Sequence, residues 1–159
     1  MNRALAAQGS AESNGSTEKR MEFISEDKCF VCGGDNPGGL QLSFEIDHKK
    51  QTLKTRFVAS PTFQGYDGVI HGGIISTLLD EAMAKLAYEL GYNAVTATLE
   101  VRFKKPAPIL EPLLVFGEIT EVNQRLVRAK SRIAKEDGTV LATATSTLVK
   151  QSPSRADSP

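Results

Sequence analysis

The clearest periodic pattern in the chain covers residues 71–90, HGGIISTLLDEAMAKLAYEL. At roughly 100° per residue, its large apolar side chains gather on one stripe, which we expect to face a core. The stripe consists of Ile75, Leu79, Ala82, Met83, Leu86 and Leu90. Gly91 follows directly and is a suitable residue to end a helix. The pattern therefore predicts one long helix.

Most of the remaining chain alternates between apolar and polar residues, which is typical of strands with one buried face. The expected strands are residues 40–47, 53–58, 95–104, 113–122, 126–134 and 140–149. Pro106 ends the third of these, and residues 123–124 and 137–138 have the composition of hairpin turns. Two strands, a helix and four strands predict an α+β domain in which an antiparallel sheet packs on a helix.

Composition limits the organisation and the partners. A length of 159 residues suits one domain, with 40% hydrophobic and 24% charged residues. Residues 1–21 and 151–159 lack an apolar period, so we expect disordered tails around a folded unit of residues 22–150. Nineteen basic and nineteen acidic residues cancel, which indicates neither nucleic acid nor a membrane as partner. Without an apolar signal segment, a cytoplasmic location is expected.

One acid of the helix needs an explanation. Asp80 falls at the edge of the apolar stripe among small residues, which leaves a trough where an extended ligand could lie. Glu81 is further round the helix with Lys85 four residues later, the ordinary ion pair of a solvated helix face. Asp80 is therefore the stronger candidate for chemistry.

The start of the helix offers a second group. Gly72 and Gly73 follow His71 where the first turn begins, and backbone N–H groups there have no partner inside the helix. An acid one to two turns further on would combine a general base or nucleophile with donors for an oxyanion, as thioester hydrolysis requires. Two glycines before a helix are also ordinary loop geometry, so the spacing leaves both interpretations open.

The segment HGGIISTLLD resembles the HGG…D/E signature of the hotdog-fold acyl-CoA thioesterases, the group that includes phenylacetyl-CoA and 4-hydroxybenzoyl-CoA thioesterases. The resemblance covers residues 29–149 and implies a hotdog fold, a sheet wrapped around one long central helix. It also implies that Asp80 is the catalytic carboxylate, that the Gly72 N–H is the oxyanion donor and that His71 shapes the loop. In one type of relative, an Asn at the position of Gly65 positions water. In this chain that role is moved to Gln64 or is absent.

The resemblance further implies a homodimer or homotetramer, paired along sheet edges, with the active site between subunits. Thr96 matches a Ser or Thr that helps to orient water in some relatives, although strand alternation places it on the exposed face, like any surface threonine. Coenzyme A phosphates need basic residues. These are expected from the row with Arg128, Lys130 and Arg132 or from the row with Arg102, Lys104 and Lys105. The other expected substrate contacts are Gly73, Gln64, Phe63 and Thr77.

Cys29 and Cys32 form the only CxxC pair. A structural zinc site takes about four ligands, and the other candidates considered, His48 and His71, lie in a turn and in the proposed active site. We therefore predict a reduced, buried or half-buried turn without a disulfide. A zinc site and a redox dithiol are the alternatives, and the role of the pair stays open. A CxxCG…NPxGL opening also occurs in a subset of these thioesterases.

The sequence thus predicts an acyl-CoA thioesterase that uses neither metal nor cofactor. A non-catalytic acyl-CoA-binding protein and an enoyl-CoA hydratase are the alternatives within the same fold. The sequence leaves four questions open. They are the acyl group, coenzyme A or acyl carrier protein as its carrier, base or nucleophile as the role of Asp80, and dimer or tetramer as the assembly.

Overall fold

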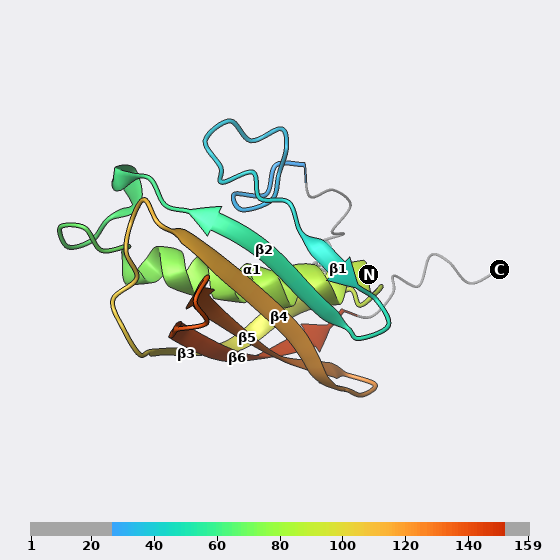
Figure 1. The fold of residues 1–159 in the computed structure, drawn as a ribbon. Coiled ribbons are helices and arrows are strands. Elements are labelled where there is room, and N and C mark those ends of the chain that lie inside the picture. The colour runs from blue at the N-terminus through green and yellow to red at the C-terminus, as the bar shows by residue number, and fades with distance from the viewer. Residues whose placement is uncertain (1–26, 152–159) are drawn as a thin grey trace, which may run out of the picture.

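The computed structural model describes residues 27–151, and the predicted tails lie largely outside this range. Six antiparallel strands form one sheet in the order β1-β2-β4-β5-β6-β3, which curves around the single long helix (Figure 1). The elements are β1 Glu45–Asp47, β2 Thr52–Val58, the 3-10 turn η1 Pro61–Phe63, α1 Gly72–Glu89, β3 Ala94–Phe103, β4 Pro112–Val122, β5 Leu126–Lys135 and β6 Val140–Lys150. The predicted order of elements, with an antiparallel sheet wrapped around a helix, is confirmed.

Two contacts set the position of α1 on the sheet. A Cβ atom on Gly117 of β4 would lie 2.4 Å from the backbone oxygen of Ala82, so only glycine lets the helix approach this closely. The buried Ser131 hydroxyl of β5 donates a 2.9 Å hydrogen bond to the carbonyl of Leu79. The predicted apolar stripe is buried against the sheet from Ile75 to Leu86. This docking decides which side chains of α1 point away from the core.

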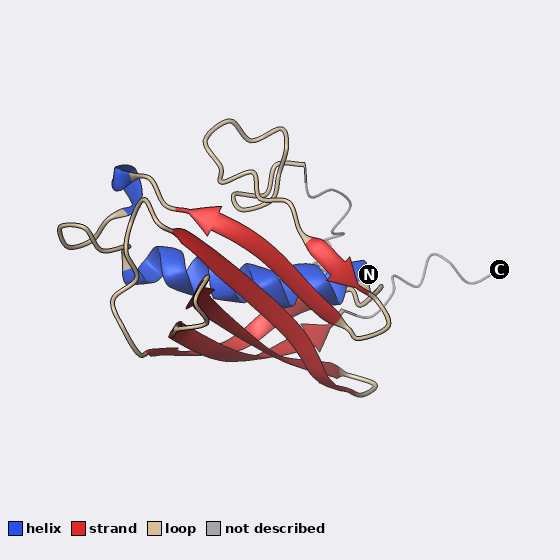
Figure 2. Ribbon diagram, viewed as in Figure 1, coloured by secondary structure: helices blue, strands red, loops and turns tan. Residues whose placement is uncertain are grey.

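The first predicted strand is much shorter than its pattern indicated. Of residues 40–47, only Glu45–Asp47 form a strand, and the preceding part is a loop (Figure 2). Leu40 and Leu42 donate 2.8 Å hydrogen bonds to the carbonyls of Phe30 and Val31, and Gln41 has a φ of 49°. The backbone is therefore bonded to the cysteine turn rather than to β2. The apolar side chains still pack against the core, which explains the misleading alternation.

The predicted burial of β3 is also wrong for the single chain. Leu99 and Phe103, expected on a buried face, are 36% and 58% exposed. The physical reason is that β3 lies at the edge of the sheet and pairs only with β6, so no further strand covers its outer side. Leu99 and Phe103 stay on the helix side of the sheet, opposite the buried Ser146 and Ala142 of β6.

Candidate active site

The loop before α1 holds His71 in place. The His71 N–H donates a 2.8 Å hydrogen bond to the Phe63 carbonyl, and a Cβ on Gly65 would lie 3.2 Å from the Cα and Cδ2 atoms of His71. The side-chain oxygen of Gln64 accepts a 3.3 Å hydrogen bond from the Gly68 N–H. Gln64 and Gly65, the two positions considered for a water-binding amide, thus both contribute to the geometry of this loop.

His71 is the N-cap of α1. Its Nδ1 atom accepts a 2.9 Å hydrogen bond from the Gly73 N–H, so a neutral ring carries its proton on Nε2. Ser76 and Thr77 donate 2.9 Å hydrogen bonds to the carbonyls of Gly72 and Gly73. The hydroxyl of Thr77, expected to contact substrate, is therefore bonded to its own helix.

The backbone N–H of Gly72 is different. Within residues 27–151, no carbonyl or side chain accepts a hydrogen bond from it. It lies at the start of an 18-residue helix, where the backbone dipoles favour negative charge. A Cβ on Gly72 would lie 3.4 Å from Cζ of Phe103, so the exposed ring of Phe103 borders this donor. Alternation along the strand predicted a buried ring at Phe103 and did not indicate this neighbour.

Asp80 and Thr96 are brought together within one chain. The Thr96 hydroxyl donates a 2.8 Å hydrogen bond to Oδ1 of Asp80, and both residues are half-buried. The expected placement of Thr96 on the exposed strand face is therefore wrong, and the bulge immediately after it marks where the alternation breaks. A hydroxyl bond to a carboxylate holds the acid in one orientation and leaves Oδ2 for another partner.

Gly72 and Asp80 do not form one site within a single chain. They are separated by eight positions on the same helix. At a rise of about 1.5 Å per residue, their backbones lie about 12 Å apart along the axis. A general base and an oxyanion donor must both lie near one carbonyl group. Within one chain, the two groups therefore do not lie near the same carbonyl group.

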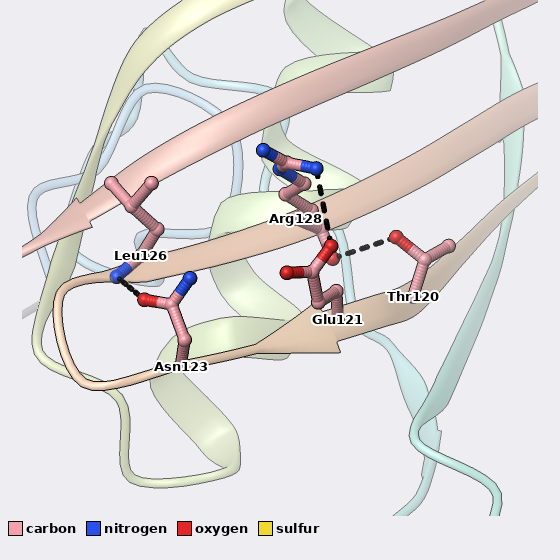
Figure 3. Close-up of polar contacts among 5 residues, drawn as sticks. All are labelled: Thr120, Glu121, Asn123, Leu126 and Arg128. Atoms are coloured by element: carbon pink, nitrogen blue, oxygen red, sulfur yellow. Dashed lines mark hydrogen bonds and ion pairs between the residues drawn. The ribbon is translucent and has the colours of Figure 1, made fainter.

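Arg128 lies apart from the helix start. Its Nη1 atom is 3.1 Å from Oε2 of Glu121 at the β4–β5 hairpin, whose turn is closed by a 2.8 Å bond from the Leu126 N–H to Asn123 (Figure 3). This hairpin is at the opposite end of the sheet from the loop that precedes α1 (Figure 1). Phe63 was also expected to contact substrate. Its ring packs against the ring of Phe57, with 6.2 Å between the two ring centroids.

A groove of about 880 Å³ lies on the sheet face that points away from α1. Its lining includes Lys54, Glu100, Arg102, Phe116, Lys130 and Arg132. Neither Asp80 nor Gly72 lines it, so we do not assign the chemistry to this groove.

Over the described residues, no helix combines the length and apolar character that a membrane span requires.

Glu81 is not simply a residue of a solvated helix face. It is half-buried, and Sγ of Cys29 lies 3.8 and 3.9 Å from its two carboxylate oxygens. Lys85 forms a 2.9 Å ion pair with Glu89. Burial, followed by the neighbouring Glu81 carboxylate and Cys29, raises the pKa of the Cys32 thiol far above its usual range. The cysteine turn, distant in sequence, thus packs against α1 next to Asp80.

Part of the chain matches a known protein family. The thioesterase superfamily matches residues 67–142, which contain α1, β3, β4, β5 and the start of β6. A crystal structure of a thioesterase superfamily protein superposes with a TM-score of 0.73 at 25% identity, covering 78% of this chain and 61% of that chain. The chain thus has the hotdog fold, and its residues 67–142 match the thioesterase superfamily.

Two named relatives match larger parts of the chain. Bovine acyl-coenzyme A thioesterase THEM4 is 25% identical over 136 residues, which cover 84% of this chain but only 56% of that relative. A thioesterase from Streptococcus pneumoniae, crystallised with coenzyme A, has a TM-score of 0.65 at 19% identity and covers 69% of this chain and 85% of that chain. The same protein was crystallised with an aspartate or a threonine, sixteen positions apart, replaced by alanine.

Proposed function

We propose that this protein hydrolyses acyl-CoA thioesters, with Asp80 as general base and the Gly72 N–H as oxyanion donor. The observation that carries the proposal is the 2.8 Å bond from Thr96 to Asp80, which orients an acid on a helix whose first N–H has no acceptor within residues 27–151. The substrate class is supported by the relatives named acyl-CoA thioesterases and by the neighbour crystallised with coenzyme A.

The active site is proposed to form between two copies of the chain. Because Gly72 and Asp80 are about 12 Å apart along one helix, Asp80 of the partner must approach Gly72. The edge of the sheet supports such a pairing, since β3 has a neighbour on one side only and exposes Leu99 and Phe103. Whether two dimers join into a tetramer does not affect this geometry.

The reaction then takes a simple course. Oδ2 of Asp80 accepts a proton from water as the water oxygen attacks the thioester carbonyl carbon. The negative charge that develops on the carbonyl oxygen accepts a hydrogen bond from the Gly72 N–H at the positive end of α1. The carbon–sulfur bond breaks, coenzyme A leaves as a thiolate that takes up the proton, and the acid is released. Direct attack by Asp80 is the competing route.

The neighbour from S. pneumoniae supports the pairing of Thr96 with Asp80. Its mutated aspartate and threonine are sixteen positions apart, and Asp80 and Thr96 have the same separation in this chain. The match concerns both residue types and their spacing. We therefore assign Thr96 the positioning of the Asp80 carboxylate.

Basic residues at the helix start are proposed to bind the coenzyme A phosphates. Lys104 and Lys105 directly follow Phe103, which borders Gly72, and both are exposed. Within residues 27–151 neither forms an ion pair, whereas Arg128 is paired with Glu121 at the other end of the sheet. The row that contains Lys104 and Lys105 is therefore favoured, and a role for Arg128 stays a prediction.

The proposal is tested by measuring thiol release from acyl-CoA esters, short to long chain plus phenylacetyl and benzoyl. The wild type is expected to turn over at least one ester, and Asp80→Asn to lose about 10²- to 10⁴-fold in kcat. Glu89→Gln is the matched control, because it removes an acid of the same helix that pairs with Lys85. Equal losses in both variants, or no turnover of any ester by the wild type, would refute the assignment.

Mixing two inactive variants tests the two-copy site. Asp80→Asn and Gly72→Pro lose different groups, so a heterodimer has one intact site and one doubly defective site. Random mixing after dissociation should restore up to about a quarter of the wild-type rate. Half of the dimers are then mixed, and each mixed dimer has one intact site out of two. If exchange of subunits is demonstrated and no activity returns, the two groups do not act across an interface.

A further inference from the structure

The cysteine turn is closed by backbone hydrogen bonds, one of which reaches a sulfur atom. The Val31 N–H lies 3.4 Å from Sγ of Cys29, and the Gly33 N–H donates a 3.0 Å bond to the Cys29 carbonyl. A Cβ on Gly33 would lie 2.5 Å from the Cys29 nitrogen, so the turn can close only with glycine after the second cysteine.

A third side chain reaches this turn from α1. One ligand atom each from Cys29, Cys32 and Glu81 lies within 4.8 Å of the others, and all three residues are half-buried. The Glu81 oxygens are 3.8 and 3.9 Å from Sγ of Cys29. In a tetrahedral zinc site, with Zn–S of about 2.3 Å and Zn–O of about 2.0 Å, sulfur and oxygen are about 3.5 Å apart and two sulfurs about 3.8 Å. The spacing already present is close to that of coordinating atoms.

We propose that Cys29, Cys32 and Glu81 bind one Zn²⁺ ion, with water in the fourth position. Two thiolates and a carboxylate suit zinc, which takes sulfur and oxygen ligands in tetrahedral sites. Their three negative charges are largely compensated by a divalent cation. Hard cations such as Mg²⁺, which take oxygen ligands, do not match two sulfurs.

The proposed ion links two parts of the chain that are distant in sequence. Cys29 and Cys32 belong to the loop before β1, whereas Glu81 follows Asp80 on α1. Bound zinc would therefore fasten this loop to the helix that carries the proposed base. The site does not take part in thioester hydrolysis as proposed above, and its existence does not depend on that activity.

The test measures metal binding directly. The full chain is purified, stripped with a chelator under reducing conditions and titrated with Zn²⁺, with the bound metal quantified by elemental analysis. Co²⁺ is the spectroscopic probe, because thiolate coordination produces a charge-transfer band. We expect one Zn²⁺ per chain and a higher melting temperature in the loaded protein, since ligand binding stabilises the folded state.

Three variants locate the ion. Cys29→Ser is expected to abolish the thiolate–Co²⁺ band, and Glu81→Gln to weaken zinc binding by about 100-fold or more, since loss of even an outer-shell partner costs about 10–100-fold. Glu89→Gln, which removes another acid of α1, should bind zinc like the wild type. If Cys29→Ser does not fold, Glu81→Gln alone decides, with its fold checked by circular dichroism.

Three results would overturn the proposal. One is a substoichiometric zinc content that excess Zn²⁺ does not raise in the reduced protein. Another is unchanged affinity in Glu81→Gln, which would show that the ion is held by the cysteines with other groups or elsewhere. A Cys29–Cys32 disulfide that persists under reductant, detected by the loss of two hydrogen masses, would overturn it as well.

Discussion

Replacing Gly72 by proline removes the backbone N–H donor from the proposed active site and puts a ring carbon in its place. The exchange suits the fold, because proline is favoured at the first position of a helix and the preceding residue must be extended. His71 has φ −59° and ψ 134°, which meets this requirement. The new Cβ would lie 3.4 Å from Cζ of Phe103, an ordinary contact. We therefore expect Gly72→Pro to fold and to retain the N-cap bond of His71.

The expected loss of kcat follows from the removal of one oxyanion donor. If the Gly72 N–H is the oxyanion donor, its removal should cost about 2.7–4 kcal/mol in the transition state, a fall in kcat of about 10²- to 10³-fold. KM should change little, since the bond strengthens only as charge develops on the carbonyl oxygen. The assay is steady-state thiol release from the best ester of the panel, with the melting temperature measured in parallel.

Gly72→Ala is the matched control, because it adds the same Cβ and keeps the N–H. It should retain most of the wild-type kcat. A comparable loss in the alanine and proline variants would show that the added carbon atom, rather than the missing donor, blocks the reaction. Wild-type kcat in Gly72→Pro would refute the role of this N–H.

Two further predictions concern the acid and the fold. Thr96→Val removes a 2.8 Å bond to a carboxylate, worth about 1.5–3 kcal/mol, so kcat should fall about 10- to 150-fold, with no additional loss in an Asp80→Asn background. Thr98→Val, beyond the bulge, should match the wild type, and equal losses in both would contradict the role of Thr96. Gly117→Ala places a Cβ 2.4 Å from a helix carbonyl, which should cost about 1–3 kcal/mol and lower the melting temperature by about 2–12 °C. Gly34→Ala, with nothing within 4 Å, should leave that temperature almost unchanged, and similar shifts in both would refute the close helix approach.

Local patterns in the sequence were sufficient for most of the fold. The apolar stripe of residues 75–86 predicted α1 because a helix buries every third or fourth residue, and Gly91 and Gly138 adopt the positive φ that their turns require. The segment of residues 40–44 misled the same reasoning. Its side chains do face the core, but its backbone bonds to a turn, and periodicity reports burial rather than hydrogen-bond partners.

What the sequence by itself determined is the set of groups carried by one helix: an N-cap histidine, a glycine N–H at the helix start and an acid two turns later. Only the tertiary structure decided their neighbours. A bulge in β3 brings Thr96 to Asp80, and the folding back of the cysteine turn brings Cys29 to Glu81. Such contacts join positions far apart in the chain. They depend on the docking of α1 and on strand register, where one inserted residue exchanges the two faces of a strand.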